Sequence, residues 1–389
     1  MSNKEKLYQE RLQRYQVTLA GGKPDKVPVV FPLGEWVIKY ANVTFQEAYY
    51  DVDKSTEIIA RVLTDVDCDT MFGSITPGPG IFNSFGCKLY RFPGIHLGED
   101  CAFQYVEEEY MPAEEYEEFI ANPTRWVVTK YLPHINEEFA EPGSYRATVA
   151  LIKSVTAFSM YNTKAAEMGQ RWAREFGIAP HSAGMTKAPF DTLGDTLRGT
   201  KGILLDLRRR PEKVLAACAA LVPHSIAFAM ITAGGDTSLP CGIPLHKGAY
   251  PFLNREYWEK FYWPSLKAVI EGLWAKGKRV WFFAEGDWTP YLDKIAELPE
   301  KSIVFCLDLT DARKAKEILG SKFCLYGGVP TTLLTYGTPQ EVKDCVKRAI
   351  DELGKDGGFV LASGGVVMSD ARRENIFAML EAAREYGVY

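Results

Sequence analysis

The chain has 389 residues, of which 47% are hydrophobic, and it carries 45 Lys and Arg against 50 Asp and Glu, for a net charge of −5. A chain of this size can bury a large core, and α/β barrels of roughly 250 residues or more often form one domain. The lack of a basic surplus argues against nucleic acid as a partner, and the lack of a long basic run argues against binding to an anionic membrane surface.

The N-terminus and the cysteines predict the compartment. Residues 1–16 are highly charged and predict a polar helix, not a signal peptide. The longest apolar region, 214–233, is interrupted by Pro223 and His224, so no stretch predicts a membrane span. The eight cysteines are scattered and contain no CxxC pair, which is typical of reduced thiols. We therefore expect a cytoplasmic protein with no membrane partner.

The first half of the chain alternates irregularly between predicted helices and short strands. The expected helices are 1–20, 45–66, 112–121, 145–176 and most of 193–233, and the expected strands are 26–31 and 68–72, with a further strand and loop in 178–190. Residues 76–106 are rich in Gly, Pro and aromatic residues, with β-like pieces at 87–92 and 103–107. This composition predicts a β-hairpin excursion or lid.

The second half shows a regular alternation of strands and helices. The expected strands are 236–240, 279–284, 302–307, 322–326 and 358–362, and the expected helices are 254–276, 289–298, 312–319, 339–353 and 372–386. Five such units, after a first half with room for the remaining strands, predict a (β/α)8 barrel of the TIM type. We expect one domain over 1–389, with extra helices in the N-terminal half and excursions within 76–180 over the barrel top.

Polar residues at the ends of the predicted strands are the candidate catalytic groups, because barrel enzymes place their chemistry there. They are Glu285, His246, Asp308 and Asp236. Each also has a structural interpretation: Glu285 as a carboxylate in a turn, His246 as a loop or capping residue, Asp308 as part of a helix cap with Asp311, and Asp236 as a turn residue.

Aromatic residues near the same strand ends are candidates for a substrate-binding box. Trp281 and Phe283 share a strand face with Glu285. Tyr326 ends the predicted strand 322–326, and Trp36 follows the predicted strand 26–31. Such a box would suit an aromatic substrate, although aromatic residues at these spacings also pack in cores.

The stretch Lys322-Phe-Cys-Leu-Tyr-Gly-Gly-Val-Pro-Thr-Thr-Leu-Leu-Thr-Tyr-Gly-Thr-Pro-Gln-Glu-Val resembles a strand, loop and helix pattern of the uroporphyrinogen decarboxylase superfamily. The segments starting at Gly358 and at Arg373 resemble its last strand and last helix. The resemblance implies a single distorted (β/α)8 barrel with a deep cleft at its top.

Two chemistries occur in this superfamily. The decarboxylases carry an Arg-rich stretch after the first strand, but here the equivalent residues are Phe31-Pro-Leu-Gly-Glu-Trp-Val-Ile-Lys, without arginine. A pocket without these arginines is a poor match for a polyanionic tetrapyrrole. The corrinoid-dependent methyltransferases carry zinc on a His-x-Cys pair and a later Cys, positions that fall here on Phe283, Glu285 and Gly365.

The resemblance therefore implies a methyltransferase with a changed metal position. Its candidate zinc ligands are Glu285, His246, Cys306 and Cys324, of which the harder pair, Glu285 and His246, could polarise an ether oxygen. The implied reaction removes the methyl group from a small O-methyl donor, possibly a methoxylated aromatic compound, and passes it to a corrinoid (cobalamin-type) cofactor on a partner protein. Two alternatives stay open: a decarboxylase or lyase acting on a small carboxylic acid, and a non-catalytic corrinoid-binding accessory.

Overall fold

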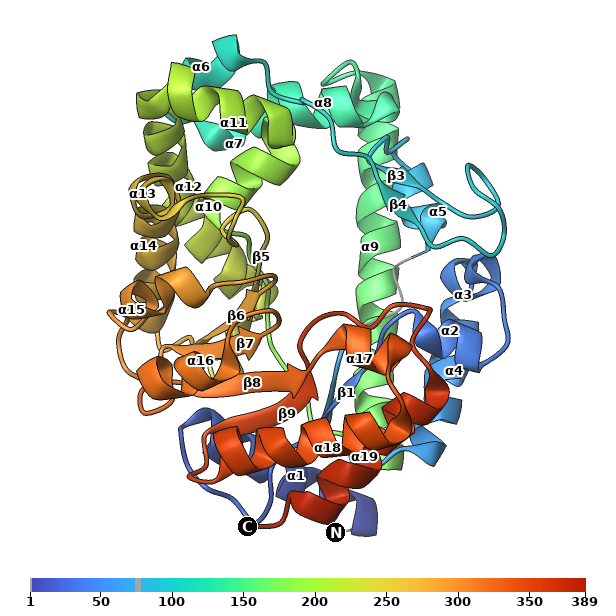
Figure 1. Ribbon diagram of the computed structural model, residues 1–389. Coiled ribbons are helices and arrows are strands. Elements are labelled where there is room, and N and C mark those ends of the chain that lie inside the picture. The colour runs from blue at the N-terminus through green and yellow to red at the C-terminus, as the bar shows by residue number, and fades with distance from the viewer. Residues whose placement is uncertain (1, 74–77) are drawn as a thin grey trace.

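A five-stranded parallel sheet is the centre of the fold. The computed structural model describes residues 2–73 and 78–389 (Figure 1). The sheet strands, in spatial and chain order, are β5 (Cys241–Leu245), β6 (Val280–Ala284), β7 (Ile303–Leu307), β8 (Cys324–Val329) and β9 (Phe359–Ser363). β6, β7 and β9 are buried along their whole length, as expected for parallel strands covered by helices on one face and packed on the other.

A second pair of parallel strands, β1 (Val30–Pro32) and β2 (Thr70–Phe72), extends this arrangement. Isolated bridges join the parts: Val29 with Leu361, Thr70 with Ala179, and Met185 with Gly242. Residues 178–186 thus lie between β2 and β5 without forming a ladder, because Pro180 has no N–H group and Gly184 adopts a φ of 82°. The result is an α/β fold with a parallel sheet, as predicted, and its arrangement is consistent with a TIM barrel.

The strands predicted at 279–284, 302–307 and 358–362 are confirmed to within a residue or two, but the strand predicted at 236–240 is wrong. Residues 236–240 form a turn in which the Asp236 carboxylate accepts hydrogen bonds from the backbone N–H (2.6 Å) and hydroxyl (2.8 Å) of Ser238. The strand begins at Cys241. Asp236 therefore lies before the start of β5, at the end opposite to His246.

The predicted helices of the first half are present, together with short helices that were not predicted. The helices are α1 (Asn3–Leu19), α2 (Trp36–Tyr40), α3 (Phe45–Tyr50), α4 (Val52–Asp65), α5 (Pro79–Asn83), α6 (Tyr116–Ala121), α7 (Pro123–Trp126), α8 (Leu132–Ile135), α9 (Tyr145–Arg171), α10 (Pro189–Asp191), α11 (Gly199–Arg209) and α12 (Pro211–Thr232). Those that were not predicted are α2, α5, α7, α8 and α10. The helix predicted at 45–66 is divided at Asp51, because its side chain caps α4 by accepting a hydrogen bond from the Lys54 N–H.

The helices of the second half cover the sheet. They are α13 (Arg255–Tyr257), α14 (Trp263–Trp274), α15 (Leu292–Ile295), α16 (Ala312–Leu319), α17 (Thr331–Tyr336), α18 (Pro339–Ala349) and α19 (Arg373–Tyr386). Short 3-10 or π turns lie between or extend them: η1 (Ala113–Glu115), η2 (Val127–Tyr131), η3 (Glu137–Phe139), η4 (Trp172–Phe176), η5 (Thr192–Leu197), η6 (Trp258–Tyr262), η7 (Thr289–Tyr291) and η8 (Ile350–Gly354).

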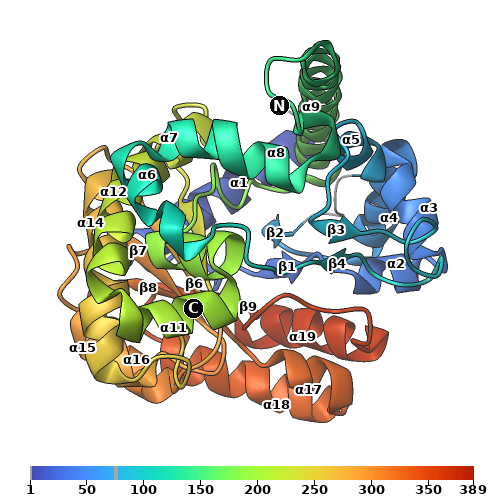
Figure 2. The same cartoon turned by 90° about the horizontal axis from the view of Figure 1, so that it is seen from above.

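The predicted excursion within 76–180 contains the antiparallel strands β3 (Tyr90–Arg91) and β4 (Gln104–Tyr105) and the helices α5 to α9. Its residues 76 and 77 lie outside the described part of the chain. In Figure 1, α9 runs along one side of the molecule, α12 and α14 lie along the other, and α6, α8 and α11 lie at the end away from α18 and α19. Figure 2 shows α7 and α8 between α12 and α9 when the molecule is seen from above.

One helix in the described residues, α12, is long and apolar enough to cross a membrane by these two criteria alone. Buried core helices meet the same criteria, and α12 packs against α6, α10 and α14 in this structure. The cytoplasmic location stays a prediction.

Two apolar clusters fill the protein. The larger lies between the strands and their covering helices. The smaller lies on the opposite face of the strands, inside what we call the ring of strands: β1, β2, residues 178–186 and β5 to β9, which the isolated bridges join. The inner cluster contains Trp281 and Phe283 of β6, Cys306 of β7, and Cys324 and Tyr326 of β8, with other buried residues. Alternate residues of each strand share a face, so one face of β6, β7 and β8 packs together here.

Candidate active site at the carboxyl ends of the strands

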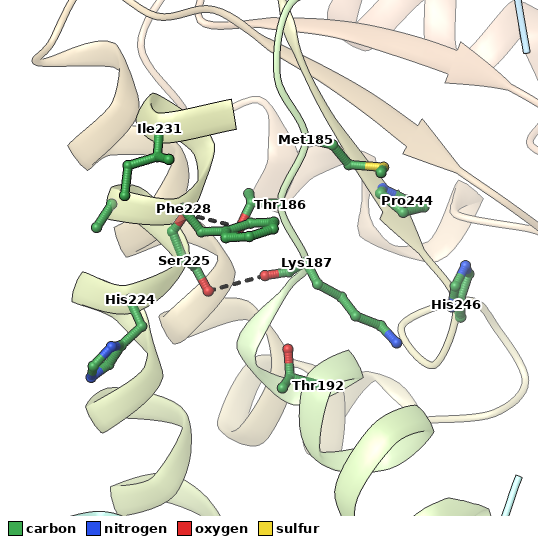
Figure 3. Close-up of a pocket in the computed structure, with 11 residues that line it drawn as sticks. Met185, Thr186, Lys187, Thr192, His224, Ser225, Phe228, Ile231, Pro244 and His246 are labelled. Atoms are coloured by element: carbon green, nitrogen blue, oxygen red, sulfur yellow. Dashed lines mark hydrogen bonds between the residues drawn. The ribbon is translucent and has the colours of Figure 1, made fainter. Parts of the chain in front are cut away.

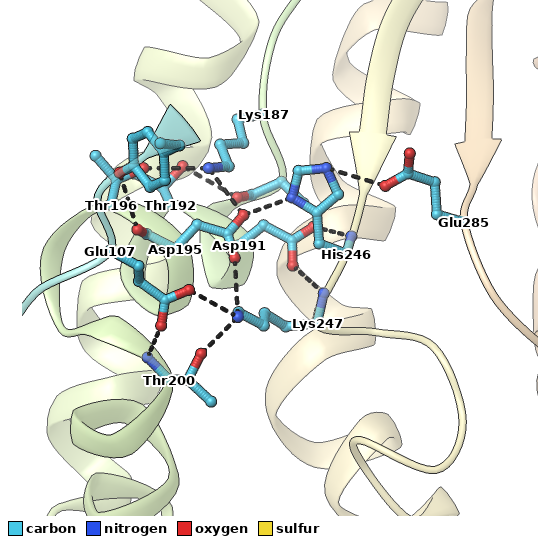
Figure 4. A network of polar contacts seen from close by, with 12 residues as sticks. Glu107, Lys187, Asp191, Thr192, Asp195, Thr196, Thr200, His246, Lys247 and Glu285 are labelled. Carbon is cyan, nitrogen blue, oxygen red and sulfur yellow. Dashed lines mark hydrogen bonds and ion pairs between the residues drawn. The ribbon is translucent and has the colours of Figure 1, made fainter. Parts of the chain in front are cut away.

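His246 and Glu285 meet at the ends of two neighbouring strands. His246 directly follows β5 and Glu285 directly follows β6, and the last residues of these strands, Leu245 and Ala284, are paired in register. The side chains are therefore brought together, with 3.2 Å between His246 Nε2 and Glu285 Oε2 (Figure 4). Position at strand ends predicted both residues, and the structure makes them direct neighbours.

The other side of the His246 ring contacts Asp195, which lies in η5. Asp195 Oδ2 is 2.6 Å from His246 Nδ1 and 2.8 Å from Lys187 Nζ. Asp195 Oδ1 is 3.5 Å from Lys247 Nζ. The imidazole is therefore held between two carboxylates, while two lysines compensate the charge of one of them.

Asp191 holds the backbone that carries His246. It is fully buried, and its carboxylate accepts hydrogen bonds from His246 N–H (3.2 Å), Lys247 N–H (2.9 Å) and the Tyr262 hydroxyl (2.7 Å). A buried carboxylate needs such donors because it has left water. These three bonds fix the position of the loop after β5 and thereby that of the imidazole.

The segment after β4 reaches this network from the excursion. Glu107 Oε1 accepts a hydrogen bond from the Thr200 N–H (2.7 Å), and its Oε2 lies 3.4 Å from Lys247 Nζ. The Tyr105 hydroxyl donates to the backbone carbonyl of Asp195 at 3.2 Å. The predicted excursion thus supplies outer contacts to the groups around His246.

Burial and these contacts together raise the pKa values of His246 and Glu285 and lower that of Asp195. Burial by itself lowers the pKa of His246, but the Asp195 hydrogen bond and the charges of Asp191, Asp195 and Glu285 outweigh burial, so this pKa lies above its usual value. Burial raises the pKa of Asp195, yet the bond from His246 and the charge of Lys187 prevail and lower it to about 2. Burial is the main cause that raises the pKa of Glu285, against the opposing charge of His246. Groups separated in this way suit acid–base chemistry.

Asp308 lies at the end of the next strand, β7. Its Oδ2 accepts a hydrogen bond from the Gly286 N–H at 2.8 Å, and burial raises its pKa despite that bond. Asp308 is not the cap of α16, because Asp311 accepts from the N–H groups of Arg313 and Lys314. It therefore remains available beside the turn that follows Glu285.

The four candidate zinc ligands do not come together. Cys306 Sγ donates to the Gly364 carbonyl at 3.4 Å, Cys324 Sγ donates to the carbonyl of the next residue at 3.6 Å, and both thiols are buried inside the ring of strands. Burial raises the pKa of Cys324 to about 12, so its thiol is neutral. In residues 2–73 and 78–389, no three His, Cys, Asp or Glu side chains are placed to hold one metal ion. His246 and Glu285 with these thiols therefore do not fit zinc.

The predicted substrate-binding aromatics are packed inside the protein, which corrects that prediction. Trp281, Phe283 and Tyr326 are 3%, 4% and 2% exposed in the inner cluster. Trp36 is also buried, on α2, and its Nε1–H donates to the Pro32 carbonyl at 2.8 Å. Trp281 and Phe283 do lie on the same side of β6 as Glu285. They lie within the strand, however, below the open end at which Glu285 stands.

A cavity of about 620 Å³ opens beside His246 (Figure 3). It lies between residues 185–187, α12 and the end of β5. Its lining residues are Met185, Thr186, Lys187, Thr192, His224, Ser225, Ala227, Phe228, Ile231, Pro244 and His246. Its size is in the range of small-molecule sites, and its walls are mainly apolar with His246 and Lys187 at one side.

Four charged residues of this site were not predicted from the sequence: Lys187, Asp191, Asp195 and Lys247. Asp191 and Asp195 are four residues apart in a segment that starts at Pro189, and this spacing puts both on one face of a helical turn. Two carboxylates on one face of an otherwise apolar segment were the available signal. Their partners are far away in the chain, so spacing alone identified none of them.

The uroporphyrinogen decarboxylase (URO-D) family model matches residues 167–386, more than half of the chain. The chain belongs to this family. The matched residues include His246, Glu285, Asp195 and Asp308, whereas most of the excursion precedes them. The predicted superfamily is thereby confirmed.

Two known proteins illustrate the range of similarity within and around the URO-D family. A uroporphyrinogen decarboxylase from Chlorobium luteolum is 24% identical over 176 residues, which are 44% of this chain and 48% of that protein. The chain thus spans about half the length of this curated relative. A methyltransferase from Methanosarcina mazei has a TM-score of 0.63 at 17% identity, and the match covers 97% of this chain and 98% of that one. The second similarity shows a shared fold.

Proposed function

We propose that this URO-D family member is a methyltransferase that demethylates a small O-methyl compound and passes the methyl group to a corrinoid protein. The observation that supports it most is the imidazole of His246, held between Asp195 and Glu285 at the edge of an apolar cavity. The shared fold with a protein named as a methyltransferase is compatible with this reaction.

Removal of a methyl group from an ether leaves the electron pair on oxygen, which then needs a proton. His246, whose pKa is raised above its usual value, can be protonated near neutral pH and donate to that oxygen, and Glu285, whose pKa is also raised, is the other candidate donor. Asp195 and Lys187 keep the imidazole oriented and compensate its charge. The corrinoid supplies the nucleophile, Co(I), that accepts the methyl group.

The cavity suggests the shape of the methyl donor. Met185, Phe228 and Ile231 expose 58%, 55% and 76% of their surface although they are large and apolar. Covering such side chains is favourable at about 25 cal/mol per Å². A methoxylated aromatic compound would cover them with its ring and place its ether oxygen towards His246. We assign no step to zinc, because the described side chains do not fit a zinc site.

Decarboxylation of a small carboxylic acid is the second candidate. Lys187 and Lys247 lie beside the site and could attract a carboxylate, and a curated relative of half this chain is a decarboxylase. Both lysines already face Asp195, however, and no arginine occurs in residues 31–39. These two facts favour methyl transfer.

Incubation of the protein with methoxylated compounds and a Co(I) corrinoid protein tests the proposal. Loss of the Co(I) absorbance is expected with the native chain and with Met160→Ala, whose side chain is 65% exposed on α9 away from this cavity. Glu285→Gln should lower the activity by about 10²- to 10⁴-fold. Release of carbon dioxide from an acid without corrinoid would support the decarboxylase instead. A native chain that transfers no methyl group yet binds the corrinoid protein would support the accessory interpretation.

A further inference from the structure

The inside of the ring of strands contains polar atoms without partners. Among the described residues, no hydrogen-bond partner faces Tyr15 Oη, Thr70 Oγ1, both ring nitrogens of His181, or Trp281 Nε1. All four side chains are buried, with 0%, 0%, 6% and 3% exposure respectively. Unpaired buried polar atoms are uncommon, because each has lost the hydrogen bonds that water would make with it.

The side chains that carry these polar atoms are neighbours in the interior. The His181 ring centre is 5.8 Å from that of Tyr15 and 4.7 Å from that of Trp281. Thr70 bridges to Ala179, two residues before His181, so the two side chains come from adjacent segments of the ring. The four side chains, from α1, β2, β6 and residues 178–186, therefore lie near one another in the interior.

The cluster is neutral and can both donate and accept. Burial lowers the pKa of His181 to about 3, so its imidazole carries one N–H and one acceptor nitrogen. The Trp281 indole donates, and the hydroxyls of Tyr15 and Thr70 do both. A neutral molecule with donors and acceptors of its own can pair with all of them, whereas an ion would find no opposite charge among these four residues.

We propose that buried water occupies the interior of the ring of strands and is hydrogen-bonded by Tyr15, Thr70, His181 and Trp281. Buried waters in proteins typically bind two to four polar partners, which this cluster supplies. The inference goes beyond the proposed function, since none of the four residues belongs to the groups around His246. The water site lies below the candidate active site, because Trp281 stacks on Phe283 and both share a strand face with Glu285.

Replacement of one hydroxyl tests the proposal by the sign of its effect. Thr70→Val keeps the shape of the side chain and removes only its hydrogen-bonding group. If water pairs with Oγ1, the substitution should lower the urea midpoint of unfolding, as Thr18→Val should. Thr18 is the matched control, since it is equally buried and its hydroxyl donates to the Arg14 carbonyl at 2.9 Å. A raised midpoint for Thr70→Val, with a lowered one for Thr18→Val, would overturn the proposal.

Three measurements on the native chain make the test independent of how the variants fold. A high-resolution crystal structure should show density within hydrogen-bond distance of Thr70 Oγ1 and a His181 nitrogen, and an interior without density would contradict the proposal. Mass spectrometry of the supernatant from denatured protein should find no stoichiometric small molecule. A released compound would show that the cluster holds an organic ligand instead of water. ¹⁵N spectra should show a hydrogen-bonded His181 ring, and a ring with two free nitrogens would be a second contradiction.

Discussion

Two histidines from opposite parts of the barrel-like ring show how strongly position sets the chemistry of one side chain. His246, at the open end, has a carboxylate at each ring nitrogen, and its pKa is raised. His181, in the interior, has no partner at either nitrogen among the described residues, and burial lowers its pKa to about 3. One is prepared to carry a proton and the other to remain neutral.

The difference arises from the segments that surround each histidine. The open end receives charged side chains from η5, from residues 185–187 and from the loops after β5 and β6. The cluster in the interior is built from apolar and aromatic side chains of the strands and α1, because burying a charge there would remove it from water without a partner. The experiments below test whether this contrast between the two regions holds.

The largest expected effect concerns the acid at the open end. Glu285→Gln keeps the shape of the side chain next to His246 Nε2, but the glutamine amide can neither take up nor release a proton. We expect methyl transfer to fall by about 10²- to 10⁴-fold, the usual contribution of a positioned acid or base. The turnover rate should be compared with that of Met160→Ala, and equal rates for both variants would show that Glu285 has no role in the reaction.

A smaller loss is expected when the carboxylate behind His246 is neutralised. Asp195→Asn removes the charge that stabilises the protonated imidazole, so the pKa of His246 should fall. If the reaction requires protonated His246, the rate of the native protein should decline as the pH rises above 6.5 through the raised pKa. In Asp195→Asn this decline should begin at lower pH, which a loss of packing alone would not cause. An unchanged pH profile would remove His246 from the proton transfer.

The interior histidine should influence stability in the opposite pH range. The pKa of His181 is about 3 in the folded protein and near 6.5 in an unfolded chain, so between these values the unfolded chain binds one more proton. His181 should therefore destabilise the protein as the pH falls, by up to about 1.4 kcal/mol per pH unit. Urea unfolding of His181→Phe between pH 4 and 6.5 should show a flatter slope than the native protein.

The corresponding substitution at the open end is the control for this slope. The folded-state pKa of His246 is raised above 6.5. Its contribution to stability is therefore fully present below pH 6.5 and is lost as the pH rises from 6.5 through the raised pKa. His246→Gln should therefore lower stability by a constant amount below pH 6.5, which leaves the acid slope intact, and should change the slope only at higher pH. If both variants flattened the dependence of stability on pH in the same pH range, the contrast between the two histidines would be wrong.

The smallest expected effect concerns the excursion. Glu107 Oε2 is 3.4 Å from Lys247 Nζ at a partly exposed position, and such pairs contribute about 0.2–1 kcal/mol. A double-mutant cycle of Glu107→Gln and Lys247→Met should show a coupling energy in this range that decreases at high salt. A coupling close to zero would show that the excursion does not stabilise the groups around His246 through this pair.

Much of the second half was predictable from local patterns. The helix 312–319 is confirmed at both ends, because Asp311 caps its first turn and Gly320 follows its last residue. The strand predicted at 236–240 failed for a local reason and a distant one. Asp236 forms a turn there, and the true strand contains Gly242 and Pro244, which by propensity disfavour a strand. Pairing with β6 outweighs that propensity.

The candidate site was likewise predictable in some residues and not in others. Glu285, His246 and Asp308 were predicted because each follows an apolar run and the carboxyl ends of parallel strands lie at one edge. Cys306 and Cys324 were misplaced as ligands, because alternation along a strand gives the face of a residue but not its depth. Depth decides whether a side chain lies in the packed interior or at the open end.

The sequence by itself determined the family, the α/β class and that Glu285, His246 and Asp308 follow strands, since these follow from local periodicity and short motifs. Only the tertiary structure decided which groups meet there. Asp195 contacts His246 across 51 residues of chain, and Asp191 of the same segment accepts a hydrogen bond from the His246 backbone N–H. Such contacts depend on where the chain returns after folding, and this return is set by packing of the whole ring of strands, which no local pattern records.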